Sequence, residues 1–381
     1  MKSFSSPVEN FKESIFATMS KLALDHKAIN LSQGFPDFEA PSWIIDKAFL
    51  AMKENHNQYA PLAGILSLRQ ELSKHFKNSY DIEYDPHQEI TITNGATEGI
   101  FSSLMALLNP GDEVIIFEPF YDSYLATIEL CRAKPVPVTL QSPHFNFDPS
   151  ELESAFSNKT KCIILNSPHN PSGKVFNLDE LQMIAKLAIK NDCYVISDEV
   201  YEFLTFDSKK HIPIASLEGM KERTITISSV GKTFSLTGWK VGWCASSEKI
   251  THHIRMVHQY NTFSVSHPFQ HAATYALQNI HKYLPDFMDS YKTKRDILLN
   301  GLKEAGLKPI TPEGTFFILC ELDEEDDIAY CQNLIKTKRV ATIPTSIFHL
   351  KSHQGKKLIR FCFAKKEKTL VEAIDLLNAH C

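Results

Sequence analysis

The feature that most constrains the fold is a series of short, uninterrupted apolar runs separated by helical patterns. Four such strand-like runs occupy residues 89–93, 113–117, 161–166 and 193–198. Helical patterns follow them over about residues 96–108, from about residue 121, and over about residues 178–191. The runs do not alternate with polar residues, which indicates strands buried on both faces. The sequence therefore predicts an α/β fold with a mostly parallel sheet covered by helices.

The pattern changes after about Pro285. A long helix is expected from Phe287 to Ala305, followed by short strands in FFILCEL and KLIRFCF with helices around them. At 381 residues the chain is too long for one ordinary core. We therefore expect a large domain at 41–285, a smaller α+β domain at 286–381, and an N-terminal segment, 1–40, that packs with the smaller domain.

Composition excludes several function classes. A formal net charge of -5 gives no excess of positive charge for binding nucleic acid or an anionic membrane. No run is long and apolar enough to span a membrane, and the N-terminus lacks the apolar core of a signal peptide. The eight cysteines occur singly, which favours reduced thiols and a cytoplasmic location. The sixteen histidines form no HExxH-like pattern, so we expect no metal site.

Lys232 is the first candidate for chemistry. It follows a strand-like run, residues 223–229, and the small-residue turn Val230-Gly231. A lysine held among small and apolar residues is poorly hydrated, which disfavours its ammonium form. Its amine could then form a Schiff base, although most lysines are solvated surface charges. A second lysine, Lys240, lies where the next strand is expected to begin.

Other candidates lie at the expected carboxyl ends of strands, where parallel-sheet proteins bind ligands. The amides of Gly95, Ala96 and Thr97 open a helix and could hold a phosphate, or the glycine could serve a tight turn alone. Asn170 belongs to NSPHNPSG, which could present amide side chains to a ligand or be an ordinary Pro/Gly loop.

Four further side chains complete the chemical pattern. Asp198 follows a buried strand, with Tyr201 three residues beyond, and needs a cationic partner such as a protonated ring nitrogen. Tyr121 could stack on a flat ligand or pack in the core. Arg360, inside an apolar strand, needs a carboxylate from the protein or from a substrate. Together these residues specify pyridoxal phosphate and an amino acid.

The chain resembles the fold-type-I, class I/II aminotransferases nearly end to end, and most closely the methionine aminotransferases near the kynurenine and glutamine aminotransferases. The motifs that carry the resemblance are AINLSQGFPDF, NQYAPLAG, NSPHNPSG, SDEVYE and GKTFSLTGWKVGW, in that order. The resemblance implies a seven-stranded, mostly parallel sheet sandwiched by helices, plus a smaller α+β domain. It also implies that the amino group of an L-amino acid is moved to a 2-oxo acid through pyridoxal phosphate in ping-pong fashion.

The resemblance also implies roles for the residues that hold the cofactor. Lys232 matches the lysine that binds it covalently and carries a proton during turnover. Asp198 matches the aspartate that pairs with the ring nitrogen. Tyr201 and Asn170 match the groups that hydrogen-bond the phenolic oxygen, and Tyr121 matches the aromatic residue that stacks on the ring.

The phosphate and the substrate have implied partners as well. The phosphate would be bound by Gly95, Ala96, Thr97, Ser229 and Lys240. Many relatives have arginine at the position of Lys240. Tyr59 matches a tyrosine that reaches the phosphate in the neighbouring subunit, which implies a homodimer with shared active sites. In the same way, Arg360 matches the arginine that binds the substrate carboxylate, helped by the Gly34 backbone and the Asn170 amide.

Side-chain specificity depends on a second stretch, HQYNTFSVSHPF (258–269). It contains no Arg or Lys, so a neutral substrate is expected in place of a dicarboxylate. Phe263 matches a pocket residue of the methionine and kynurenine relatives. Kynurenine-type relatives have a histidine where this chain has Ser264, which favours methionine, with aromatic amino acids, glutamine and kynurenine still possible.

Rival readings of the same residues are weaker. Residues 229–232 fit SxxK, but the SDN and KTG motifs of penicillin-recognising hydrolases are absent. Residues 231–233 read GKT, the end of a nucleotide-binding loop, but Thr226 stands where that loop requires its first glycine. The sequence also has no GxGxxG motif, which a dinucleotide-binding enzyme would need. We do not expect the helix-turn-helix module of aminotransferase-like regulators, because the sequence starts with the aminotransferase N-terminal segment. The open alternative is a pyridoxal-phosphate β-lyase acting on cysteine conjugates, which sequence does not separate from a transaminase.

Overall fold

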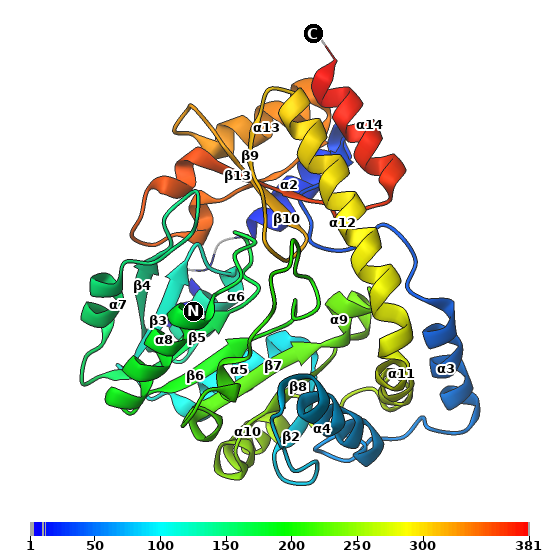
Figure 1. The fold of residues 1–381 in the computed structure, drawn as a ribbon, viewed down its shortest axis with the longest axis vertical. Coiled ribbons are helices and arrows are strands. Elements are labelled where there is room, and N and C mark those ends of the chain that lie inside the picture. Colours follow the sequence, from blue (N-terminus) through cyan, green and yellow to red (C-terminus); the bar gives the residue numbers. More distant parts are fainter. Residues whose placement is uncertain (1–3, 10, 12, 380–381) are drawn as a thin grey trace.

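A seven-stranded sheet forms the centre of the protein, as seen in a computed structural model that describes residues 4–9, 11 and 13–379 (Figure 1). Every neighbouring pair is parallel except the two that include β8. The prediction of a mostly parallel seven-stranded sheet is therefore confirmed. In spatial order the strands are β2 (Ile90–Asn94), β8 (Val241–Ala245), β7 (Thr224–Ser229), β6 (Tyr194–Asp198), β5 (Thr160–Asn166), β3 (Glu113–Glu118) and β4 (Lys134–Thr139).

Alternate residues of one strand enter two separate hydrophobic cores. Ile115 and Phe117 of β3 pack with α7 (Pro149–Ala155) and α8 (Leu178–Lys190), whereas Val114 and Ile116 pack with helices of the other layer. That layer consists of α5 (Gly95–Leu107), α6 (Asp122–Leu130) and α10 (Glu248–Asn261). Burial on both faces explains why the strands read as continuous apolar runs.

At one edge of the sheet the sequence gives only weak evidence for a strand. β4 is formed by the segment KPVPVT, which contains Pro135 and Pro137. Prolines argue against a strand because proline has no N–H to donate to the hydrogen bonds between strands. β4 is the edge strand beside β3, so one side of it needs no partner. At the opposite edge, α4 (Leu66–Tyr80) and α11 (His267–Gln278) cover β2 and β8, and α3 (Ser42–Lys53) packs on α11.

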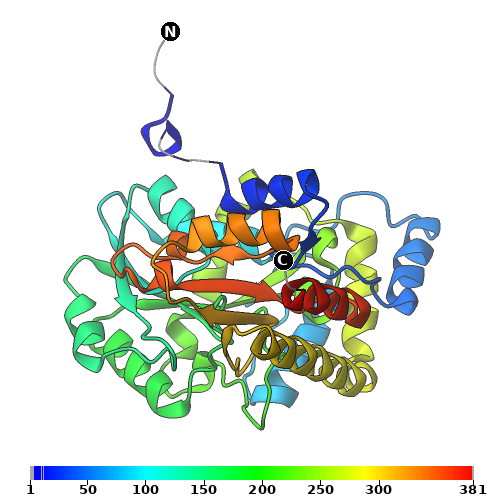
Figure 2. The same ribbon diagram turned by 90° about the horizontal axis from the view of Figure 1, so that it is seen from above.

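A second, four-stranded antiparallel sheet lies beyond the carboxyl ends of the large sheet (Figure 1). Figure 2 shows it between two helical pairs, α2 with α13 and α12 with α14. Its strands are β12 (Ile343–Pro344), β13 (Leu358–Cys362), β10 (Phe317–Glu321) and β9 (Lys308–Ile310), and its helices are α2 (Ile15–Asp25), α12 (Ile280–Glu304), α13 (Asp327–Lys338) and α14 (Glu367–Asn378).

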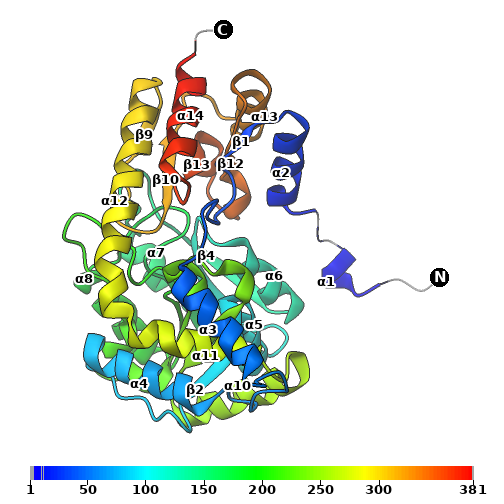
Figure 3. The same ribbon diagram turned by 90° about the vertical axis from the view of Figure 1, so that its right-hand side faces the viewer.

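The N-terminal segment packs against this smaller sheet. Figure 3 shows α2 beside α13, and the chain after α2 forms β1 (Ile29–Asn30), which pairs in parallel with β11 (Val340–Ala341). Residues 1–3, 10, 12, 380 and 381 of the outer segments lie outside the described residues. The division at 1–40, 41–285 and 286–381 stays a prediction.

The long helix begins earlier than the sequence predicts. α12 starts at Ile280, seven residues before Phe287, and continues through Pro285. A proline in a helix removes one backbone hydrogen bond, so the sequence reading placed the start after it. Here the helix is held on both sides of the proline, because Tyr283 and Phe287 both pack into the core. In the part of the chain that the structure describes, no helix has both the length and the apolar character needed to cross a membrane.

Candidate active site

A cavity of about 450 Å³ lies where the two sheets face each other. Three of its lining residues, Asn166, Asp198 and Ser229, are the last residues of the adjacent strands β5, β6 and β7. β13 closes the cavity from the smaller sheet with Arg360. The cavity is thus at the carboxyl ends of the parallel strands, where the sequence analysis placed it.

The structure brings most of the predicted site residues into this one cavity. Two of them, Tyr59 and Phe263, do not line it. Those that do are Gly34, Gly95, Ala96, Thr97, Tyr121, Asn170, Asp198, Tyr201, Ser229, Lys232, Lys240 and Arg360.

Lys232 lies on α9 (Val230–Thr233), one turn after β7 ends. Its Nζ donates to the Gly34 carbonyl at 3.3 Å and is 5.3 Å from the centre of the Phe316 ring. Burial, with a further contribution from the nearby Arg360 charge, lowers the pKa of Lys232 to about 8. A substantial fraction of the amine is therefore neutral, and nucleophilic, at physiological pH.

Asp198 is buried at the end of β6 and is held by a tyrosine. Tyr124 donates its hydroxyl to Oδ2 of Asp198 at 2.6 Å, and the amide of Val200 donates to Oδ1 at 3.4 Å. Burial raises the pKa of Asp198 to about 6, and the Tyr124 hydrogen bond limits that rise. The carboxylate is therefore ionised at neutral pH although it lies in an apolar setting.

The N-terminus of α5 forms an anion cradle. Its N-cap residue, Asn94, makes no side-chain capping bond, so the first amides of the helix are left for another acceptor. Two glycines allow the close packing here. A Cβ on Gly95 (φ +75°) would lie 3.2 Å from Nζ of Lys240, and one on Gly242 would lie 2.7 Å from the amide nitrogen of Ala96.

Arg360 is buried on β13 without a carboxylate partner in the described parts of the chain. It donates to Oδ1 of Asn170 at 2.9 Å and to the Ser32 carbonyl at 3.1 Å, and its guanidinium lies 3.9 Å from the centre of the Phe317 ring. Its Nε has no hydrogen-bond partner there. A buried guanidinium with an unused donor is suited to an anionic ligand.

Two tyrosines form polar walls of the cavity. Tyr121, at the start of α6, lies edge-on to Tyr124, and burial raises its pKa to about 12. Tyr201 is buried with its ring edge-on to Phe316. Burial also raises the pKa of Tyr201 well above the usual tyrosine value, so both hydroxyls keep their protons and can donate.

Tyr59 and Phe263 lie together on the surface instead. Their rings meet edge-to-face with centroids 5.3 Å apart, and Tyr59 is 81% exposed. Ser264, the next residue, donates to the Ala60 carbonyl at 3.0 Å.

The sequence reading missed several residues that line the cavity. Tyr124 belongs to EPFYDSY, from which the sequence analysis selected only Tyr121. Because Tyr124 follows Tyr121 by three residues, it lies on the same side of α6, and this spacing was the available signal. Thr237 follows Lys232 within the same motif. Ser14 and Phe16 come from the N-terminal segment, and no pattern in the sequence connects them with the distant strands.

The family profile described as "Aminotransferase class I and II" matches residues 26–377, which is most of the chain. The chain belongs to the class I and II aminotransferases. The protein is an aminotransferase, its cofactor is pyridoxal phosphate, and the cavity fits that group: Lys232 supplies a neutral amine, Asp198 a buried carboxylate, and α5 a phosphate cradle.

Relatives within this aminotransferase family match the chain nearly end to end. The methionine aminotransferase of Escherichia coli (strain K12) is 41% identical over 367 residues, covering 96% of this chain and 95% of that protein. The kynurenine–oxoglutarate transaminase 3 of Rattus norvegicus is 39% identical and covers 97% of this chain and 89% of that protein. These relatives support transamination and give no support for the β-lyase alternative.

Solved structures agree with the fold. The N-succinyldiaminopimelate aminotransferase from Mycobacterium tuberculosis superposes with a TM-score of 0.96 at 37% identity, covering 99% of both chains. An Escherichia coli structure described as having a methionine aminotransferase function superposes with a TM-score of 0.95 at 39% identity, covering 99% of this chain and all of that one. The aminotransferase fold is therefore shared over its full length.

Proposed function

We propose that this aminotransferase takes the amino group from a neutral L-amino acid, with methionine favoured and aromatic amino acids, glutamine or kynurenine as further donors, and passes it to a 2-oxo acid. The observation that carries this substrate class is the set of cations in the cavity. Among the described lining residues these are Lys232, Lys240 and Arg360. The cofactor and the substrate α-carboxylate use all three, so none remains for a second carboxylate.

The proposed cofactor contacts follow from the geometry. When bound, pyridoxal phosphate supplies an electron sink for the bond-breaking at the substrate Cα. Lys232 would hold its aldehyde carbon, and the low pKa of this lysine would let the freed amine carry a proton between the substrate Cα and that carbon. The Asp198 carboxylate would keep the ring nitrogen protonated, while Tyr201 and Asn170 donate to the phenolic oxygen and Tyr121 covers the ring face.

The phosphate and the substrate would be held at opposite ends of the cavity. The amides of Gly95 and Ala96, the hydroxyls of Thr97 and Ser229 and the Lys240 ammonium would bind the phosphate. At the other end, Arg360, which lines the cavity and has an unused donor at Nε, would bind the α-carboxylate. The Gly34 backbone and the Asn170 amide would help Arg360 to hold the substrate carboxylate.

Two relatives favour methionine or an aromatic amino acid as donor, since one is a methionine aminotransferase and the other a kynurenine–oxoglutarate transaminase. Phe263 lies outside this chain's own cavity, beside the exposed Tyr59, so it would supply an apolar surface to a substrate bound in the partner subunit. Ser264, bonded to the Ala60 carbonyl, stands where kynurenine-type relatives have a histidine. This replacement favours methionine over kynurenine.

A homodimer with shared active sites and a cytoplasmic location complete the proposal. The 81% exposure of Tyr59 supports a role in a partner's site. The seven cysteines of the described residues are free and buried, which supports a reducing compartment.

The test is a half-reaction screen. Holoenzyme is mixed with single amino acids, without an acceptor, and conversion of the bound cofactor to its amine form is followed by absorbance. Methionine and aromatic amino acids should convert it fastest, and aspartate and glutamate should be at least about tenfold slower, because a buried unpaired carboxylate in the side-chain pocket is costly. Fastest conversion by aspartate would contradict the proposed substrate class.

A further inference from the structure

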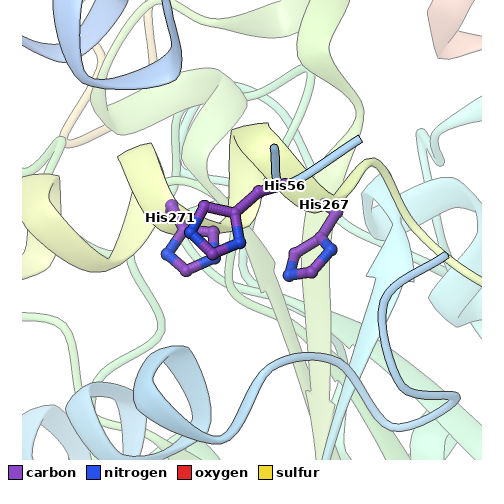
Figure 4. Close-up of side chains that lie close together, drawn as sticks. All are labelled: His56, His267 and His271. Carbon is purple, nitrogen blue, oxygen red and sulfur yellow. The ribbon is translucent and has the colours of Figure 1, made fainter. Parts of the chain in front are cut away.

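Three histidines gather on the surface, away from the catalytic cavity (Figure 4). His267 and His271 lie one turn apart on α11, and His56 lies in the chain that follows α3. Each contributes one ring nitrogen to a group in which all three nitrogens are within 4.8 Å of one another. All three side chains are half-buried.

The spacing is close to that of a metal-ligand set. Zinc–nitrogen bonds of about 2.0–2.1 Å place tetrahedral ligand nitrogens about 3.3 Å apart. The His56 and His271 rings now face each other with centroids 3.9 Å apart, and the His267 ring is 5.1 Å from each of them. The nitrogens, now within 4.8 Å of one another, would have to approach to about 3.3 Å, a change that small side-chain rotations of half-buried histidines can supply.

Two details of hydrogen bonding prepare the histidines for a ligand. Nδ1 of His267 lies 3.1 Å from the Gln58 carbonyl, a bond that places the proton on Nδ1 and leaves Nε2 as an acceptor. Nε2 of His271 is buried and has no hydrogen-bond partner among the described residues. A buried nitrogen without a partner costs free energy that a bound ion would recover.

An acidic residue also lies near the cluster. Glu54, the C-cap residue of α3, is close enough to His271 to interact with it electrostatically. A carboxylate beside three imidazoles favours the approach of a divalent cation.

We propose that His56, His267 and His271 form a binding site for a divalent transition metal, with Zn²⁺ as the occupant. Three imidazole nitrogens suit Zn²⁺ and do not suit Mg²⁺ or Ca²⁺, which require oxygen ligands. The ion would tie the chain after α3 to the first two turns of α11. Tyr59 follows His56 by three residues, so the ion would stiffen the segment that carries this exposed tyrosine.

This proposal replaces the expectation of no metal site. His56 is 211 residues before His267 (267 − 56), so nothing in the sequence connects them. The i,i+4 spacing of His267 and His271 was a usable signal, because such a pair lies on one face of a helix.

The test uses holoenzyme without a polyhistidine tag, dialysed against a chelator and then titrated with ZnCl₂ by calorimetry, with retained zinc measured by mass spectrometry. We expect one Zn²⁺ per chain. His56→Gln, His267→Gln and His271→Gln should each weaken binding at least about tenfold. His253→Gln is the matched control, because His253 is also a helical histidine with Nδ1 on a carbonyl, that of Lys249, but stands outside the cluster. It should bind zinc as the unmodified protein does.

A second measurement guards against a variant that fails to fold. Zinc at about 100 times its Kd should raise the Tm of the unmodified protein by on the order of 3 °C and should not raise the Tm of His56→Gln, a change in a surface turn. The proposal is overturned if the unmodified protein retains no stoichiometric zinc. It is also overturned if His56→Gln and His271→Gln bind zinc with unchanged affinity, which would leave the cluster as stacked imidazoles only.

Discussion

Arg360 donates to Oδ1 of Asn170 at 2.9 Å, and this bond joins the smaller sheet to the loop that follows β5 of the large sheet. The same guanidinium also donates to the Ser32 carbonyl of the N-terminal segment. Three distant parts of the chain therefore meet at one cation. The position of the proposed substrate-binding group is set by how the two sheets are held together, as well as by β13 itself.

Arg360→Ala should raise KM for the amino acid by about 10- to 100-fold, since a charge-assisted hydrogen bond contributes about 1.5–3 kcal/mol. Arg360→Lys should recover part of this loss because it keeps the charge but not the two-pronged geometry. Steady-state kinetics measures both. Arg295→Ala is the matched control: Arg295 is also buried, but it pairs with Asp207 at 3.1 Å and should affect stability and not KM. An unchanged KM in Arg360→Ala would reject its role.

Tyr124→Phe should lower kcat about tenfold, because it removes a hydrogen bond to the buried Asp198 carboxylate. That bond limits the pKa of Asp198 to about 6, so the acid limb of the kcat–pH profile should move to higher pH. Tyr80→Phe is a fair comparison, since Tyr80 donates to the buried Glu202 carboxylate at 2.6 Å outside the cavity. If both variants shift the profile equally, Tyr124 has no particular connection with the cofactor.

The apoenzyme should take up pyridoxal phosphate covalently with a pH dependence centred near pH 8. Burial lowers the pKa of Lys232 to about 8 from the usual 10.5, and only the neutral amine is nucleophilic, so uptake rises as pH increases through that value. Borohydride reduction followed by peptide mapping measures the bond formed. Lys232→Ala should show no covalent uptake and no turnover. A profile centred near pH 10.5 would indicate a solvated lysine.

Gly242→Ala should weaken cofactor binding and lower the Tm. The added Cβ would lie 2.6 Å from the Gly95 carbonyl carbon and 2.7 Å from the Ala96 nitrogen, both of which are backbone atoms. The start of α5 would have to move, which costs about 1–3 kcal/mol. Gly238→Ala serves for comparison, since nothing lies within 4 Å of its Cβ and it is in the same motif. Cofactor titration and thermal melts compare the two variants. Equal cofactor affinity and equal Tm would show that the start of α5 does not bind the phosphate.

A mixture of Tyr59→Ala and Lys232→Ala subunits should regain activity if active sites are shared. A heterodimer then has one site with native Lys232 from one chain and native Tyr59 from the other. Random pairing makes half of the dimers mixed, so about a quarter of all sites become intact. Activity after mixing and re-equilibration is the measurement. Activity no higher than the sum of the separate variants would place Tyr59 in its own subunit's site.

Much of the fold was predictable because apolar runs and helical periods are local. The order of strands and helices from β2 to β8 follows from continuous runs that bury both faces, and the carboxyl ends of those strands located the cavity. The sequence gives no comparable signal for β4, whose prolines are tolerated only because it is an edge strand. The start of α12 was missed because Pro285 interrupts its helical pattern while packing on both sides holds the helix.

The candidate site divides in the same way. Residues at strand ends, such as Asp198 and Lys232, could be proposed from their local setting, whereas Tyr124 required knowing that α6 turns one face to the end of β6. The histidine cluster depends on α3 and α11 packing together, which is a tertiary contact between segments about 200 residues apart. Chemistry assembled by such contacts leaves no local pattern.

α12 is one uninterrupted rod of 25 residues that starts beside α11 and ends beside α14. Such a helix is about 37 Å long. Pro285 removes one hydrogen bond in its second turn, so the helix is most easily bent near its base. A bend of only about 5° there would displace its far end by about 3 Å, by the same length. A slight bend beside the large sheet would therefore become a displacement of several ångströms where α12 packs on α14, at the outer side of the smaller sheet.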